Sequence, residues 1–162
     1  MEEIIDRRKE IYEFADTLVD SLPIMSSGIY RSDDISLCFE LCDFLYFEQV
    51  YPIKEYAPLK KTVVRYGMNS KCVQADIRIK EYDKNFQLFL ILWGFSHELI
   101  EDVDMGREIE CDAIAYNIFK EYGTKKYSLK DAHLSFIGFL GKVTSAKELS
   151  LKRINALNYQ IN

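Results

Sequence analysis

The feature that most constrains the fold is an apolar run at residues 86–95, in which only Gln87 is strongly polar. Because its apolar side chains fall on every side of a helix, the run predicts a helix that passes through the core. Asp83 or Asn85 can cap the start of this helix. The longest uninterrupted apolar stretch, residues 88–95, is far shorter than the roughly 20 residues that cross a bilayer, so no membrane span is predicted.

Two more helices are predicted before the core helix. Apolar residues recur at helical spacing over residues 3–22, and Pro23 ends that pattern. A second pattern begins near Asp33 or Asp34, either of which can cap it. Its inner stripe consists of Ile35, Cys38, Leu41, Cys42 and Leu45. Nearby phenylalanines widen the apolar arc, so we expect this second helix to be covered on more than one side.

The last third of the chain is predicted to be helical. A helix expected at residues 107–122 is stopped by Gly123. Capping sequences precede a helix at residues 132–143, and residues 145–148 form a capping box before a final helix.

In the middle of the chain, apolar and polar residues alternate instead of recurring at helical spacing. Residues 62–66 are typical of a short strand, residues 67–70 of a turn, and residues 73–80 of a half-buried strand. These segments predict one β-hairpin. Residues 1–162 are therefore expected to form a single α+β domain, mainly α-helical, with about five or six helices and one small β-hairpin.

The net charge of −5 is concentrated in one segment. Residues 97–112 hold seven acidic residues and one arginine. The overall charge argues against a broad nucleic-acid surface, and no membrane partner is expected. The acidic segment instead favours a protein partner with a basic surface. The oligomeric state is not predicted.

The four cysteines are too dispersed to suggest a zinc knuckle, because none form a Cys-x-x-Cys pair. They are Cys38, Cys42, Cys72 and Cys111. The N-terminal residues are charged throughout and do not resemble a signal peptide. We therefore expect free, buried thiols and a cytoplasmic protein.

Several metal-binding side chains fall on two consecutive predicted helices. His97 and Glu101 lie one helical turn apart, and Glu98 occupies a neighbouring face. On the following helix Glu108 and Asp112 share a face. A short turn would fold these helices into a pair, so that one imidazole and two carboxylates could hold one divalent metal.

These residues resemble a known family. A long apolar helix that ends in His97-Glu98 after a hairpin resembles the HExxH metallopeptidases. The segment Glu108-Ile109-Glu110-Cys111-Asp112-Ala113-Ile114-Ala115 resembles the Glu-x-x-Ala-Asp element of their gluzincin branch. Residues 89–98 look most like the Lit-type phage-exclusion peptidases and their relatives in mobile elements. Residues 152–157 weakly resemble an Arg-Ile-x-x-Leu helix of some relatives, whereas the main resemblance covers about residues 73–122.

The resemblance implies a metallopeptidase-like pair of active-site helices with a role for each residue. His97, Glu101 and Glu108 would bind the metal, and Glu98 would be the general base that activates a metal-bound water. Asp112 would support the ligands from behind.

The motif departs from the family pattern at its centre. Glu101 stands where the family has its second histidine, and Cys111 replaces the alanine before the aspartate. A second carboxylate reduces the charge left on the metal and weakens the activation of water. A His-Glu-Glu set suits manganese or ferrous iron better than zinc, and the cofactor is expected to be either absent or one divalent metal, namely zinc, manganese or iron. The only other histidine, His133, would reach the site only if its helix packs there.

Each of these residues also has a purely structural interpretation. His97 could be an ordinary histidine at a helix end, and Glu101 a solvent-facing acid. Asp112 lies among apolar residues in the middle of a helix, so a buried partner is expected. His97 and Arg107 are the candidates for that partner.

Three functions follow from these interpretations. The first is a metallopeptidase-like domain with impaired catalysis that binds a protein through the groove beside the hairpin, where an extended peptide could add to an edge strand. The resemblance implies a prokaryotic or phage setting, in defence, counter-defence or the control of a mobile element. The second is an active metal-dependent hydrolase. The third is an acidic helical interaction protein unrelated to peptidases.

Overall fold

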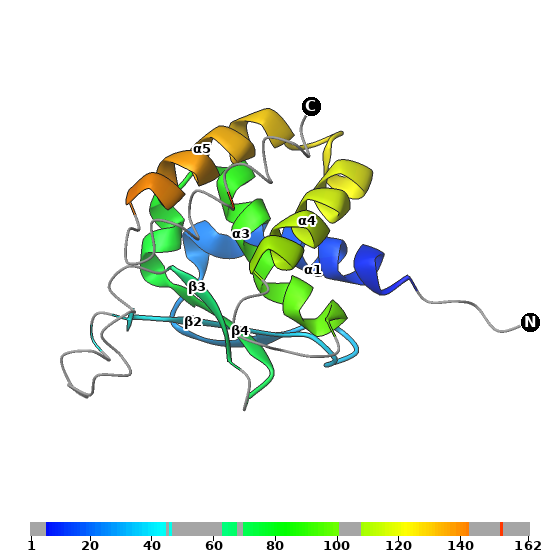
Figure 1. Ribbon diagram of the computed structural model, residues 1–162. Coiled ribbons are helices and arrows are strands. Elements are labelled where there is room, and N and C mark those ends of the chain that lie inside the picture. The colour runs from blue at the N-terminus through cyan, green and yellow to red at the C-terminus, as the bar shows by residue number, and fades with distance from the viewer. Residues whose placement is uncertain are drawn as a thin grey trace, which may run out of the picture.

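The computed structural model describes residues 6–44, 46, 63–67, 70–100, 108–142 and 153. Its main helices lie on one side of a sheet (Figure 1). The helices are α1 (Arg7–Ser21), α3 (Lys84–Ser96), α4 (Glu108–Ile118) and α5 (Leu129–Lys142). The strands are β1 (Gly28–Arg31), β2 (Cys38–Cys42), β3 (Val64–Gly67) and β4 (Cys72–Asp76).

The four strands form one mixed sheet in the order β1-β2-β4-β3. β1 pairs antiparallel with β2, β2 pairs parallel with β4, and β3 pairs antiparallel with β4. The predicted hairpin exists as β3 and β4, with Val64 opposite Ala75, but the strand predicted at residues 73–80 ends at Asp76 and a 3-10 helix (Ile77–Glu81) follows it. The hairpin is half of a larger sheet, however, and the expectation of five or six helices with one small hairpin is wrong: the described residues form four α-helices and four strands.

The main error in the predicted fold is the helix expected from Asp33 onward. The structure forms a turn there and then β2. Four of the five residues of β2 are buried, on both faces of the strand, namely Cys38, Phe39, Leu41 and Cys42. A short apolar run buried on both sides has neither the alternation of a half-exposed strand nor a distinctive helical period.

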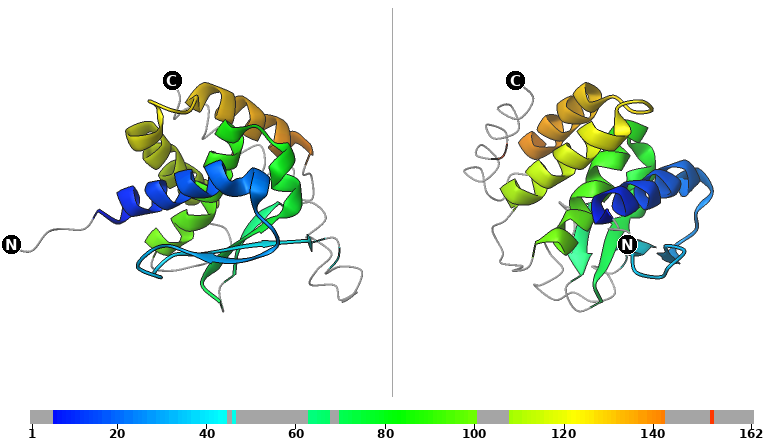
Figure 2. Two further views of the ribbon diagram at one scale, coloured as in Figure 1. Left: turned by 180° about the vertical axis from the view of Figure 1, so that it is seen from behind. Right: turned by 90° about the vertical axis from the view of Figure 1, so that its right-hand side faces the viewer.

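The core is organised around α3, which packs against α1, α4 and α5 (Figure 2). As predicted, α3 is buried almost all round, and the Asp83 side chain caps it by accepting a hydrogen bond from the backbone N–H of Phe86. Gly94 lets α3 approach the sheet closely, because a Cβ there would lie only 2.7 Å from Cγ1 of Val73. Within the described residues, no helix is long and apolar enough to cross a membrane.

The remaining described helices agree with the sequence pattern. Asp6 caps α1 by accepting from the N–H of Arg8. α4 continues into a π-helical turn (Phe119–Gly123) that includes the predicted stop, and the Ser128 hydroxyl accepts from the N–H of Asp131 at the start of α5. The final helix predicted after residues 145–148 lies outside the described residues, except for Arg153.

Two of the four cysteines are bonded to each other, so the expectation of four free thiols is wrong. Cys38 of β2 and Cys72 of β4 form a disulfide, with their Cα atoms 4.7 Å apart. Cys42 and Cys111 are buried and lie outside this disulfide. The two cysteines can pair because Cys38 lies in β2, the strand next to β4. The sequence pattern placed residue 38 in a helix, so it did not predict this bond.

Candidate functional site

The His97-Glu98 motif lies where α3 ends, in a short 3-10 turn (His97–Leu99). Nδ1 of His97 lies 3.0 Å from the carbonyl oxygen of Gly94, one turn earlier. A carbonyl oxygen can only accept, so Nδ1 is the donor and the lone pair of the neutral ring is on Nε2. This is the tautomer that a metal-binding histidine commonly uses.

Two aromatic rings fix the plane of the His97 imidazole. Tyr66 of β3 stacks on it with ring centres 5.3 Å apart and planes inclined by 7°. Trp93 of α3 meets it edge-on, with ring centres 5.0 Å apart at 84°. The imidazole is therefore held between β3 and α3 by contacts that require no metal.

Glu98 forms an ion pair with α1. Nη2 of Arg7 lies 2.9 Å from Oε2 of Glu98, and the Glu98 side chain is only 13% exposed. Burial raises the pKa of Glu98, and the charge and hydrogen bond of Arg7 oppose that rise. The same guanidinium donates to Glu10 at 3.0 Å and to the Ser36 hydroxyl at 2.9 Å. The predicted general base is thus part of a charge network that links α1 to the end of α3.

Of the three predicted metal ligands, only His97 has a described side chain. Glu101 lies outside the described residues, and Glu108 begins α4 but its side chain is not described. Among the described side chains, no group of three or more His, Cys, Asp or Glu residues is placed to hold a metal. The set of His97, Glu101 and Glu108 therefore stays a prediction.

Asp112 has a buried partner, as its sequence context predicted, and that partner is Arg153, whereas the candidate Arg107 lies outside the described residues. The two carboxylate oxygens of Asp112 accept from Nε and Nη2 of Arg153 at 2.9 and 2.8 Å. The candidates His97 and Arg107 were nearer in sequence, whereas Arg153 lies 41 residues away. Arg153 belongs to the segment with the Arg-Ile-x-x-Leu resemblance, which was the one feature in the sequence that pointed to it.

Trp93 connects this ion pair with the His97 motif. The Arg153 guanidinium lies 5.7 Å from the centre of the Trp93 ring, on the helix turn before His97. The indole Nε1 of Trp93 is buried and makes no hydrogen bond within the described part of the chain. His133 is buried and bonded through Nδ1 to the hydroxyl of Tyr116, one turn after Asp112. This contact joins α5 to α4.

The ion pair with Arg7 involves the residue that the motif assigns as general base. In zinc peptidase chemistry the glutamate of the motif faces a metal-bound water and accepts its proton. Here Oε2 of Glu98 accepts a hydrogen bond from Arg7 at 2.9 Å, which opposes the rise in pKa without cancelling it, because burial is the larger effect. The ion pair thus engages one of the two oxygens that would accept that proton.

Two residues of the site could not be identified from the sequence. Arg7 is 91 residues from Glu98, and no pattern in the first helix distinguishes it from its charged neighbours. Tyr66 lies on the predicted hairpin, but its stacking on His97 depends on the sheet packing against α3.

Comparison with known proteins gives no match for this chain among protein-family models, curated proteins or solved structures.

Proposed function

We propose that the chain is a metallopeptidase-like domain that acts by binding a protein partner, with catalysis impaired. The observation that carries this proposal is the Arg7–Glu98 ion pair. It gives the glutamate of the motif a structural role, which fits a scaffold better than a general base. The resemblance of residues 89–98 to phage-exclusion peptidases supports a cytoplasmic role in prokaryotic or phage defence, counter-defence or mobile-element control.

The charge distribution supports a basic protein as the partner. Residues 97–112 carry seven acids against one arginine in a chain whose net charge is −5, although Glu98 and Asp112 are paired with Arg7 and Arg153 inside the fold. An excess of negative charge speeds association with a positive partner and disfavours acidic ones. The Tyr66–His97 stack also holds β3 beside the end of α3, in keeping with the groove expected next to the hairpin.

Peptide hydrolysis by matched variants tests the proposal. The protein is supplied with zinc, manganese or ferrous iron and incubated with a labelled arginine-rich peptide, and the peptide is then analysed by mass spectrometry. We expect the wild-type protein and Glu98→Gln to leave it equally intact. Glu81→Gln is the matched control, because Glu81 is exposed and loses the same charge.

A Glu98-dependent cleavage would overturn the proposal. That result is hydrolysis by the wild-type protein and by Glu81→Gln, but not by Glu98→Gln. Metal content per chain gives a second test, because near-stoichiometric metal that disappears in His97→Ala would establish a metal centre in place of a binding scaffold.

A further inference from the structure

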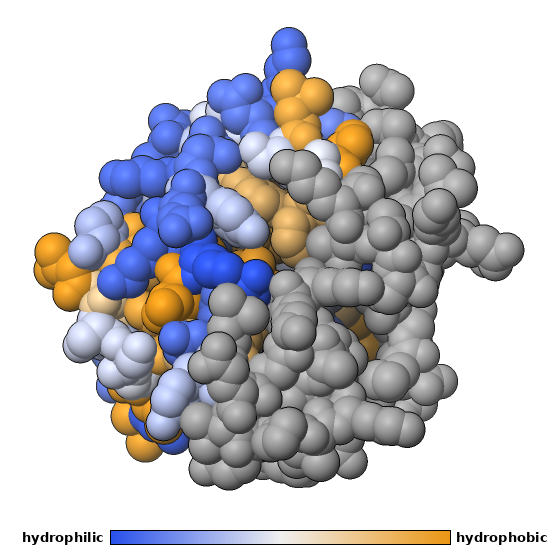
Figure 3. Space-filling model, turned by 90° about the vertical axis from the view of Figure 1, so that its left-hand side faces the viewer, coloured by the Kyte–Doolittle hydropathy of each residue, from blue (hydrophilic) through white to orange (hydrophobic). Residues whose placement is uncertain are grey.

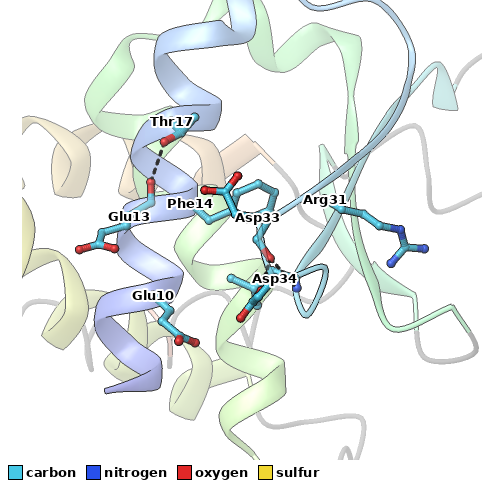
Figure 4. Close-up of a pocket in the computed structure, with 9 residues that line it drawn as sticks. Glu10, Glu13, Phe14, Thr17, Arg31, Asp33 and Asp34 are labelled. Carbon is cyan, nitrogen blue, oxygen red and sulfur yellow. Dashed lines mark hydrogen bonds between the residues drawn. The ribbon is translucent and has the colours of Figure 1, made fainter. Parts of the chain in front are cut away.

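A pocket of about 470 Å³ lies between α1 and the turn that joins β1 to β2 (Figure 4). It is at the β1 end of the sheet, whereas the His97 motif stacks on β3 at the other end. Its volume is in the range of ordinary ligand pockets. It adjoins the Glu98 ion pair, because Arg7 also donates to Glu10 of its lining and to Ser36 of its turn, but it is distinct from the ring stack on His97.

The walls of this pocket carry excess negative charge. α1 contributes Glu10 and Glu13, and the turn contributes Asp33 and Asp34, while Arg31 is the one basic residue of the lining. Figure 4 shows the Arg31 side chain extending away from these acids. Among the described residues, neither Glu13 nor Asp33 has a cationic partner. The pocket thus offers carboxylates that a cation from outside can neutralise.

One of these carboxylates is rigidly held. Oδ1 of Asp34 accepts hydrogen bonds from the Ser36 hydroxyl at 2.6 Å, the Ser36 N–H at 3.0 Å and the Ser32 hydroxyl at 2.8 Å. These bonds, that of the Ser36 hydroxyl first, lower the pKa of Asp34 to about 2, so it is ionised at physiological pH. All three bonds use one oxygen, which leaves Oδ2 to accept from a ligand.

Apolar side chains form the floor and rim of the pocket. Phe14 lines it and packs against Phe95 with ring centres 5.7 Å apart, and the buried Leu37 lies beside it. Ile35, at the turn, is 71% exposed and has a φ of 59°, a conformation that is rare for a β-branched residue. Elsewhere, exposed apolar patches lie among hydrophilic side chains, as Figure 3 shows for one face. The turn thus places one exposed apolar side chain next in sequence to Asp33 and Asp34.

We propose that this pocket binds an arginine side chain from a basic, partly apolar segment of a partner protein. The guanidinium would pair with the carboxylates of Asp33 and Asp34 while its aliphatic stem covers Phe14 and Leu37. An apolar neighbour of that arginine would cover Ile35. The inference deepens the proposed binding function and rests on it, since it names the chemistry of the partner and the place where it binds.

Binding of a defined peptide tests this proposal. The probe is a fluorescein-labelled pentapeptide with two arginines flanking a leucine, and its control contains citrulline in place of arginine. Binding is followed by fluorescence anisotropy. We expect the arginine peptide to bind, the citrulline peptide to bind at least tenfold more weakly, and the affinity to fall as salt rises.

Matched variants locate the binding site. Asp33→Asn and Glu13→Gln should each weaken binding about two- to fivefold, the range expected for exposed charge pairs. Asp131→Asn and Glu81→Gln remove the same charges from exposed positions on α5 and after β4, and should leave the affinity unchanged. Ile35→Asn should also weaken binding, because it removes the apolar rim while suiting the backbone conformation.

Three results would overturn the proposal. They are undetectable binding of the arginine peptide, equal binding of the citrulline peptide, and equal effects of the pocket variants and the remote variants. Equal effects with the peptide still bound would refute this pocket but keep the proposed binding function. Cleavage of the peptide that depends on Glu98 would instead refute the proposed function.

Discussion

Arg153 donates two hydrogen bonds to Asp112, one to each carboxylate oxygen, and both side chains are nearly buried. The guanidinium also lies 5.2 Å from the centre of the Phe136 ring on α5. One residue near the end of the chain therefore contacts α4 and α5, and through Trp93 also α3. Removing either partner of such a pair leaves the other charge buried without its counter-ion and destabilises the fold.

Arg153→Met should destabilise the fold strongly. It leaves the Asp112 carboxylate buried without its guanidinium, at a cost of about 3–5 kcal/mol in the free energy of unfolding. Urea denaturation followed by circular dichroism measures this loss. Arg8→Met breaks an exposed pair with Glu121 and should cost less than about 1 kcal/mol.

A double variant separates loss of charge pairing from loss of packing. Asp112→Leu combined with Arg153→Met replaces both charges with apolar groups, and it should recover most of the stability that Arg153→Met loses. If the double variant were as unstable as Arg153→Met, loss of the guanidinium from the buried carboxylate would not be the cause.

The Cys38–Cys72 disulfide makes a direct prediction about thiol counts. Unfolded but unreduced wild-type protein should show two free thiols, from Cys42 and Cys111. Cys38→Ala frees Cys72 and should raise the count to three, whereas Cys111→Ala should lower it to one. Titration with a chromogenic disulfide in denaturant measures these counts, and four thiols in the wild-type protein would show that the bond does not form.

The same bond should contribute to stability. It closes a loop with a sequence separation of 34, for which the loss of entropy in the unfolded chain corresponds to about 3–4 kcal/mol. Reduction should lower the free energy of unfolding by that amount in the wild-type protein. It should have no effect on a variant with alanine at both positions.

Asp16 should make the stability depend on pH in the acid range. Burial opposes ionisation of its carboxyl, but hydrogen bonds from Lys126 at 2.9 Å and Tyr127 at 2.5 Å lower its pKa. The folded state then binds fewer protons than the unfolded state, whose pKa is about 4. The stabilisation is present above pH 4 and is lost as the pH falls through the folded-state pKa.

Asp16→Asn isolates this contribution. At pH 7 it should lower the free energy of unfolding by about 1 kcal/mol, a value limited by the partial exposure of the pair. The difference from the wild-type protein should shrink below pH 4. A difference that stayed constant from pH 7 to pH 2 would contradict the linkage.

The sequence predicted those parts of the fold in which one period dominates. The unbroken apolar run of α3 and the alternation around β4 were identified, and so were the capping residues Asp83 and Ser128. β2 was assigned to a helix because its buried residues cover both faces. β1 was missed because it has only four residues, which alternate between half-buried and exposed, and so short an alternation does not distinguish a strand from a loop.

The candidate site was predictable only where its residues are neighbours in sequence. His97 and Glu98 stood out because their spacing resembles a metal-binding motif. Their contacts with Tyr66 and Arg7 depend on how β3 and α1 pack against α3, and no local pattern encodes that packing. Asp112 was expected to have a buried partner because of its apolar surroundings, but its surroundings did not specify which cation would reach it.

Gly94 and Gly138 should respond to the same substitution with opposite signs. Both lie in helices, where alanine is favoured over glycine by about 1 kcal/mol. A Cβ at Gly138 meets nothing within 4 Å, so Gly138→Ala should stabilise the protein by about that amount.

A Cβ at Gly94 would lie 2.7 Å from Val73 Cγ1 and 3.2 Å from Val64 Cγ1. Because these stiff β-branched side chains cannot move aside easily, Gly94→Ala should destabilise by about 1–3 kcal/mol despite its helix propensity. Thermal denaturation of the two variants measures both effects, and adding Val73→Ala to Gly94→Ala should relieve the clash. If Gly94→Ala were as stabilising as Gly138→Ala, α3 would not be packed against β4 as closely as the structure shows.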